Sequence, residues 1–191
     1  VMAIRYARLA NRPALFANIV NYFGAHTITI QDGAASLKMA MENISVSDIN
    51  KSLRLMIASA VVLIKDGHFS IAQRKLEQVD KMLGQYSDYE DNNYGSVKTD
   101  FIATQYLLAL YKNDNFNRDY LDQCEIEAYK NSVFDGLIGF VHALKSLLYQ
   151  RNASFSRSEA EAERAMRYYK VSKSNYGIAS VHIIRGLCYF T

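Results

Sequence analysis

The chain has 191 residues, of which 50% are hydrophobic and 21% are charged, so it is long enough to bury the core of one domain. Its formal net charge of +3 is spread along the sequence, which argues against the dense basic face that binds nucleic acid. A single proline and nine glycines leave few helix breakers, and no segment alternates with period two for long. We therefore expect an all-α fold.

The amino-terminal part predicts an early helical hairpin over about residues 1–24. Its second helix would begin at Pro13, because proline is tolerated in the first turn of a helix. A short further helix is predicted over 32–44. The longest apolar run, at 55–64, is far shorter than the roughly 20 residues that cross a bilayer, so we expect a buried core helix there and no membrane segment.

The features that report on the cellular compartment favour the cytoplasm. Residues 1–13 have no continuous apolar centre followed by a small-residue cleavage site, so no signal peptide is predicted. Cys124 and Cys188 lie in separate predicted helices and no CxxC pattern occurs, which favours neither a disulfide framework nor a zinc site. Both ends of the sequence fall within a helical pattern, so we expect a fragment of a longer protein.

Three short stretches share a basic residue, then Asn or Asp, and a phenylalanine in the fifth position. They are KDGHF at 65–69, KNDNF at 112–116 and RNASF at 151–155. In each, the cation suits the last turn of a helix, and the residues that follow tolerate the left-handed conformation that closes it: Asp66 and Gly67, Asn113 and Asp114, and Asn152. The phenylalanine would pack back across the corner. We interpret these stretches as corners of repeated helical hairpins.

Alignment of the corners on phenylalanine gives separations of 47 and 39 residues, which is typical of helical-hairpin arrays. The stretch IGFVHALKSLLY at 138–149 also matches IASVHIIRGLCY at 178–189, at an offset of 40. We therefore predict a single domain over 1–191, a right-handed superhelix with a polar loop at 84–95. Its later hairpins would cover about 50–84, 96–130 and 132–172, with a truncated unit from 175.

The same repeat gives the candidate binding residues. His142 with Lys145, and His182 with Arg185, place an imidazole and a cation one helical turn apart at corresponding positions. In tetratricopeptide-like stacks the first helices line the concave surface, so these four residues are candidates for a strip that binds an anionic or sugar-like ligand or an acidic peptide. The alternative is that the histidines pack between helices while the cations extend to solvent.

No catalytic motif with a known mechanism occurs, so we expect no enzyme, no catalytic residues and no cofactor in this chain. Glu159 and Glu163 lie on a predicted exposed helix face, where carboxylates lack the burial that tunes acid–base catalysis. The stretch 88–99 offers oxygen ligands, but Asn93 stands where a calcium-binding EF-hand has glycine and Thr99 where it has glutamate. An ordinary acidic loop, without metal, is expected.

The stretches AIRYARLA (3–10), ANIVNYFG to KMAME (17–42), LRLMIASA to KLEQV (53–79) and SEAEAERA to GLCYF (158–190) resemble the helical-repeat domain of MalT-like regulators of the LuxR family. The resemblance implies a tetratricopeptide-like superhelix that lies between a nucleotide-binding switch module and a carboxy-terminal helix-turn-helix. Neither the phosphate-binding GxxxxGK[ST] loop nor a DNA-reading helix-turn-helix occurs here. ATP and operator DNA would then be bound only by separate modules.

The resemblance further implies that this region senses an effector, by binding a small-molecule inducer or a protein or peptide partner. It would make no direct contact with nucleic acid or membrane, and the full-length regulator would be free to form oligomers. The alternative from another class is a stand-alone tetratricopeptide scaffold that binds proteins and has no connection with transcription.

Overall fold

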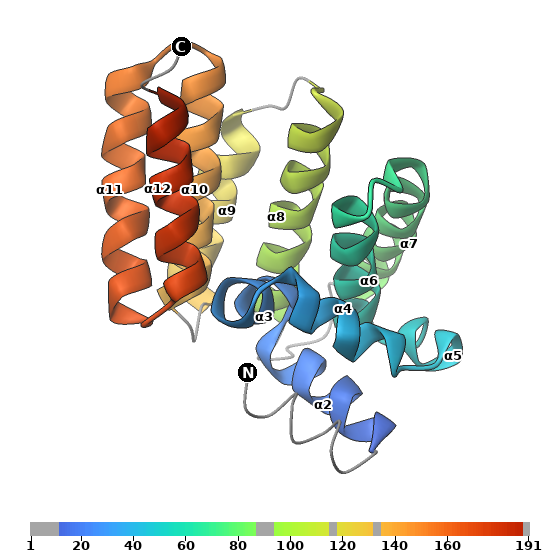
Figure 1. Ribbon diagram of the computed structural model, residues 1–191. Coiled ribbons are helices and arrows are strands. Elements are labelled where there is room, and N and C mark those ends of the chain that lie inside the picture. Colours follow the sequence, from blue (N-terminus) through green and yellow to red (C-terminus); the bar gives the residue numbers. More distant parts are fainter. Residues whose placement is uncertain (1–11, 87–93, 115–117, 132–134, 189–191) are drawn as a thin grey trace.

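The computed structural model describes residues 12–86, 94–114, 118–131 and 135–188. Over these residues the chain forms eleven helices and no strand, which confirms the all-α prediction (Figure 1). None of the described helices is both long and apolar enough to span a membrane. In chain order the helices are α2 (Pro13–Phe23), α3 (Ala25–Asp32), α4 (Ala34–Glu42), α5 (Val46–Ile49), α6 (Leu53–Lys65), α7 (Phe69–Tyr86), α8 (Tyr94–Lys112), α9 (Arg118–Asn131), α10 (Asp135–Arg151), α11 (Phe155–Val171) and α12 (Asn175–Cys188).

The amino-terminal region contains a helix that the sequence did not predict. Helix α2 begins at Pro13 as expected, whereas the expected first helix of that hairpin falls at 1–11, outside the described residues. The predicted helix over 32–44 is the shorter α4. Before it, α3 has the sequence AHTITIQD, rich in β-branched residues that disfavour a helix, and is separated from α4 by Gly33 at φ 84°. The loop predicted at 84–95 lies mostly outside the described residues, as does half of the stretch 88–99 considered for calcium.

The turns that close α6, α8, α10 and α11 share one hydrogen-bonding pattern. After α6, the amide of Gly67 donates to the Ile64 carbonyl (3.1 Å) and the amide of His68 donates to the Leu63 carbonyl (2.8 Å), which is the Schellman motif. The corresponding residues of the other turns make the same bonds at positive φ: Asn113, Ala153 and Lys173. Gly67, Asn113 and Ala153 follow the first helices α6, α8 and α10, and they are separated by 46 and then 40 residues. The second separation equals the offset of 40 between the matched helix sequences.

Two details of the predicted corners are wrong. Ala153, and not Asn152, has the left-handed conformation (φ 52°), because the Schellman pattern places that conformation two residues after the last helical residue. Phe155 is 43% exposed and does not pack across its corner. Phe69 does pack against the core, beside Tyr111 of the next first helix, with ring centroids 6.2 Å apart. Phe116 lies outside the described residues.

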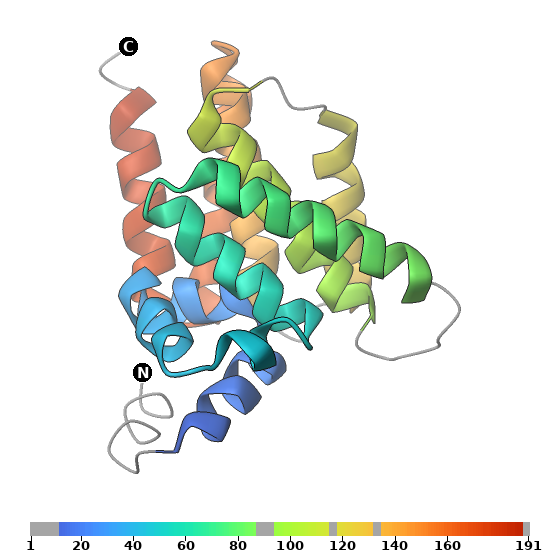
Figure 2. The same ribbon diagram turned by 90° about the vertical axis from the view of Figure 1, so that its right-hand side faces the viewer.

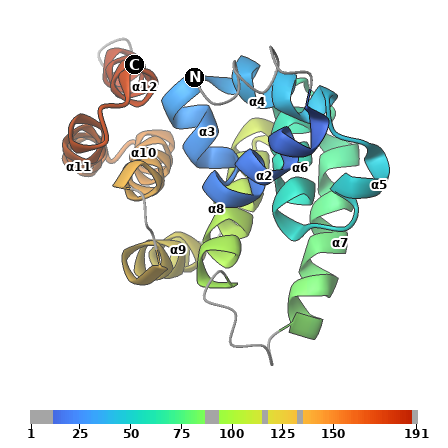
Figure 3. The same cartoon turned by 90° about the horizontal axis from the view of Figure 1, so that it is seen from below.

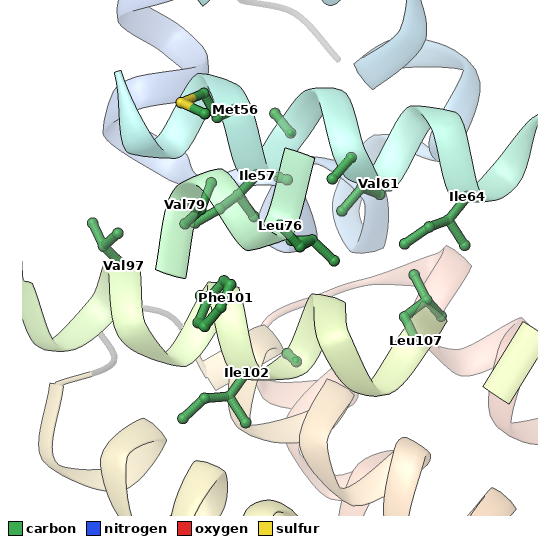
Figure 4. Close-up of a cluster of buried hydrophobic side chains, with 14 of the residues drawn as sticks. Met56, Ile57, Val61, Ile64, Leu76, Val79, Val97, Phe101, Ile102 and Leu107 are labelled. Carbon is green, nitrogen blue, oxygen red and sulfur yellow. The ribbon is translucent and has the colours of Figure 1, made fainter. Parts of the chain in front are cut away.

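The first helices contact one another as well as the second helices of their hairpins. Helix α6 runs beside α7 and also contacts α8, and α10 contacts α8, α11 and α12 (Figures 2 and 3). Apolar side chains of α6, α7 and α8 interdigitate in the main core (Figure 4). They include Met56, Ile57, Val61, Ile64, Leu76, Val79, Val97, Phe101, Ile102 and Leu107. Helices α6 and α7 therefore share their apolar core with α8.

Helix α3 lies across the first helices and joins the two parts of the core. It contacts α6, α10 and α12, and Figure 3 shows it between the group α9–α12 and the group α6–α8. Ile28 belongs to the main core and Ile30 to a second cluster formed with α10, α11 and α12. The Ser174 hydroxyl donates to the Ile30 carbonyl (2.7 Å), and the Gln31 amide donates to the Ser172 carbonyl (3.0 Å). Part of the face that the first helices form is therefore covered by the chain itself.

Candidate functional site

A cluster of polar side chains lies between α9, α10 and α11 and is centred on His142, which has no exposed surface. Its Nδ1 atom is 2.7 Å from Glu161 Oε2, and its Nε2 atom is 3.1 Å from the Tyr129 hydroxyl. Because an ionised carboxylate only accepts, Nδ1 donates to Glu161, and Nε2 bonds the Tyr129 hydroxyl. Tyr168 completes the cluster, since its hydroxyl donates to that of Tyr129 (3.0 Å) and its ring stacks on His142.

Lys145 lies one turn further along α10 and extends the cluster towards α9. Its ammonium group contacts Asp122 Oδ1 at 2.5 Å and also bonds Glu125. Burial alone would lower the pKa of Lys145, but the hydrogen bonds to Asp122 and Glu125 outweigh it and raise the pKa. Burial likewise acts to raise the pKa of Glu161, and the hydrogen bond from His142 helps to bring it below its usual value. The charges of the cluster are therefore paired across the helix interfaces.

Arg185 repeats the interaction of Lys145 one unit later. Its Nη2 atom lies 2.5 Å from Glu159 Oε1 and 3.6 Å from Glu163 Oε1, both on α11. In both α10 and α12 a cation thus binds two carboxylates on the preceding helix. The two glutamates lie on a solvated face, as their sequence pattern indicates, and they pair there with a cation from the next helix. Because these side chains are partly exposed, the pairs stabilise the interface only modestly.

The four predicted binding residues therefore do not meet in one strip. His142 and Lys145 lie together between α9, α10 and α11, and Arg185 lies against α11. His182 is exposed on α12. The sequence reasoning did not identify the partners Glu161, Tyr129 and Tyr168, or the carboxylates of α9. The available signal was the pair of acidic residues on the helix before each cation, Asp122 and Glu125 before Lys145, and Glu159 and Glu163 before Arg185.

A second buried polar group joins α3 to α8. His26 Nε2 is 2.8 Å from Thr104 Oγ1, and the His26 ring stacks on Phe140 with centroids 4.4 Å apart. Burial lowers the pKa of His26 to about 3. Asp100, one turn before Thr104, is 3% exposed, and its Oδ1 atom has no hydrogen-bond partner among the described residues. Burial raises the pKa of Asp100 to about 7, although the charge of Arg54 opposes this rise.

Backbone geometry explains why Asp100 fits beside the start of α3. Gly24, between α2 and α3, has φ 77°, a conformation that favours glycine. A Cβ atom at Gly24 would lie 2.3 Å from Asp100 Oδ2, so only glycine allows the carboxyl group to pack here. Gly24 is thus needed both for the positive φ of the turn and for the close contact with Asp100 of α8.

The order Tyr129, His142, Glu161 resembles a hydroxyl activated by a histidine base and an orienting carboxylate. The imidazole is fully buried and both its nitrogens are engaged by side chains of the neighbouring helices. The hydrogen bonds of the cluster connect α9, α10 and α11. Over the described residues, no three His, Cys, Asp or Glu side chains are grouped to hold a metal ion. Comparisons of the chain with protein families, curated proteins and solved structures found no match.

Proposed function

We propose that the chain is a tetratricopeptide-like helical-repeat module, a right-handed superhelix of hairpins, whose function is to bind a protein partner. One observation carries this proposal: the same Schellman turn closes α6, α8 and α10, and each of these helices contacts another first helix. Arrays of this kind bind their partners through extended surfaces made by several units. The buried histidine cluster supports the stacking of the units and is not the binding surface.

Within this class, we propose that the module is the effector-sensing and protein-contact region of a MalT-like regulator of the LuxR family. The resemblance of the repeat sequences supports this assignment, as does an all-α fold over the whole described chain. ATP and operator DNA would be bound by separate modules. Binding of an inducer or partner here would shift the regulator between resting and active states through its different affinity for the two.

The position of α3 restricts where a ligand binds. Because α3 covers part of the face formed by the first helices, a ligand on that covered part would have to displace buried contacts such as the His26–Thr104 hydrogen bond. We therefore place partner binding on surfaces that α3 leaves open. Of the four predicted residues, His182 on α12 is the exposed one, whereas His142, Lys145 and Arg185 pair with side chains of α9 and α11.

The coding sequence on both sides of this region tests the regulator against the stand-alone scaffold. A GxxxxGK[ST] loop encoded upstream and a helix-turn-helix encoded downstream would support the regulator. Absence of both modules from the complete reading frame would refute it and leave the scaffold. In the regulator, deletion of α12 from the full-length protein should abolish the response to the inducer while ATP binding by the upstream module persists.

A further inference from the structure

Helix α3 is a short bridge whose neighbours in the chain are both anchored on α6. Helices α2 and α4, which precede and follow it, contact each other and also contact α6. From this base the eight residues of α3 extend to α10 and α12, as Figure 3 shows. The bridge therefore joins two parts of the molecule, while the segments before and after it belong to one part only.

A glycine with positive φ separates α3 from the helix on each side. Gly24 has φ 77° and Gly33 has φ 84°. A glycine cap supplies no side chain to bind the first amides of the helix that follows, and glycine changes its backbone angles at little cost. Hinges in proteins are residues of this kind at the ends of elements. Helix α3 can therefore change its direction while α2 and α4 keep theirs.

The side chains that hold α3 in place include few large apolar groups. Of its buried residues, only Ile28 and Ile30 are large and aliphatic, and His26 and Thr27 are polar. His26 relies on a single hydroxyl of α8, that of Thr104, for its side-chain hydrogen bond at Nε2. Release of α3 would return these polar groups to water and would remove two large aliphatic side chains from the core. The helix is thus held less firmly than its burial suggests.

The carboxyl group of Asp100 opposes the closed position of α3 at one of the two glycines. A Cβ atom at Gly24 would lie 2.3 Å from Asp100 Oδ2, so the carboxyl group packs directly on the glycine. The side chain is buried, and its Oδ1 atom has no hydrogen-bond partner among the described residues. A buried acceptor of this kind costs free energy that hydration would recover. Movement of α3 away from α8 would let water reach it.

We propose that α3 is a latch, residues 25–32, which moves outward as a unit about Gly24 and Gly33 and so loosens the packing of α10, α11 and α12 against α6, α7 and α8. When the latch is closed, Ile28 in the main core and Ile30 in the second cluster fix the angle between the two groups of helices. When it is open, that angle varies, although α10 stays attached to α8 and α9. The latch belongs to the repeat array itself, in a regulator and in a stand-alone scaffold alike.

Hydrogen exchange of the 191-residue chain, followed by mass spectrometry, tests whether α3 opens by itself. After correction for intrinsic rates, residues 25–32 should exchange at least about tenfold faster than α4, α6 and α8. Because a local opening exposes little surface, exchange of α3 should hardly change at low urea concentrations, whereas exchange of α6 should accelerate.

Two results of this experiment would overturn the proposal. The first is exchange of α3 at the rate and with the urea dependence of α6, because α3 would then open only when the whole chain unfolds. The second is exchange of α2 as fast as that of α3, because the amino-terminal region would then fray from its end and no latch would move between two hinges.

Matched glycine variants test the hinge. Gly24→Ala brings a Cβ atom against Asp100 and disfavours the positive φ, so exchange of α3 should become about tenfold faster while α6 and α8 are unchanged. Gly84→Ala on α7 is the control, because its Cβ atom would meet nothing within 4 Å. If Gly24→Ala does not fold, Thr104→Val decides, since loss of the hydroxyl that bonds His26 should also speed exchange of α3 by about tenfold. Equal acceleration in α3, α6 and α8 would refute the latch.

A distance measurement tests whether the latch controls the two groups of helices. Spin labels are attached after Ile71→Cys on α7 and Ile183→Cys on α12, two exposed positions, in a Cys188→Ser background where buried Cys124 stays unlabelled. Double electron–electron resonance should show a broader distribution of distances in the variant that speeds exchange of α3, and an unchanged one in the α7 control. An unchanged distribution in a variant whose α3 exchanges faster would show that α3 opens without moving the groups, which would overturn the proposal.

Discussion

Replacing Asp100 by asparagine should change how the stability of the protein depends on pH. Burial raises the pKa of Asp100 from 3.8 to about 7, against the opposing charge of Arg54. Between these two values the folded chain keeps a proton on Asp100 that the unfolded chain has released. The folded state is therefore stabilised by this group at low pH, and that contribution is lost as the pH rises towards 7.

The magnitude follows from the two pKa values. At 1.36 kcal/mol per pKa unit, the difference corresponds to about 4 kcal/mol above pH 7. About 2 kcal/mol of this is lost between pH 5 and pH 7. His26 acts in the opposite direction, because burial lowers its pKa from 6.5 to about 3 and the unfolded chain then binds the extra proton. Between about pH 4 and 6.5 the two groups make opposite and equal contributions to the change of the free energy of unfolding with pH in the wild-type chain. In Asp100→Asn only the contribution of His26 remains, so stability rises with pH.

Urea unfolding followed by circular dichroism, at several values between pH 4.5 and 7.5, measures this effect. The free energy of unfolding of Asp100→Asn relative to wild type should increase by about 2 kcal/mol from pH 5 to pH 7. Asp66→Asn, which removes an exposed carboxylate paired with Lys38, is the control and should not show this increase. Parallel pH profiles for wild type and Asp100→Asn would refute the reasoning. If the profiles are parallel and Asp100→Asn is also less stable than wild type at pH 7, then Arg54 keeps Asp100 ionised in the folded chain.

Three other predictions concern the same helices. Glu161→Gln should lower the free energy of unfolding by about 2 kcal/mol in a urea titration, because it replaces a charged acceptor beside a buried histidine; an effect below 0.5 kcal/mol would contradict the proposed role of the cluster. In urea unfolding, Ala153→Gly should raise the free energy of unfolding and Gly67→Ala should lower it, each by about 1 kcal/mol, since both residues have positive φ; changes of the same sign would contradict this. In a Cys188→Ser background, Cys124 should react with a disulfide reagent only as fast as the chain opens, because burial raises its pKa to about 12; a rate unaffected by added urea would show that the thiol is accessible.

The hairpin corners were predictable because their chemistry is local. The residues around Gly67 and Asn113 suit a left-handed helix end by themselves, and a few residues of sequence contain that information. At the third corner the hydrogen bonds of the Schellman motif place Ala153 in the left-handed conformation, although alanine disfavours that conformation. The corner was therefore found, but the residue that makes the turn was misidentified.

Helix α3 was missed for the opposite reason, because its contacts are distant in the sequence. Its threonines and isoleucines favour a strand, and no local signal outweighs them. The helix is held by His26 on Thr104, 78 residues away, and by Ile30 on Ser174, 144 residues away. Tertiary packing overrides the local preference, and a single sequence does not reveal which distant residues supply that packing.

The recurrence of the histidine and cation pair is explained by the interfaces between units. The cation of each pair binds carboxylates on the preceding second helix, for Lys145 as for Arg185. His142 bonds Glu161 of the following helix in addition to Tyr129 of the preceding one. His182 has the same sequence position and no such cover within the described residues. If the pair recurs because each first helix contacts a neighbour on both sides, then α10 shows both contacts: Lys145 binds the carboxylates of α9, and His142 binds Glu161 of α11.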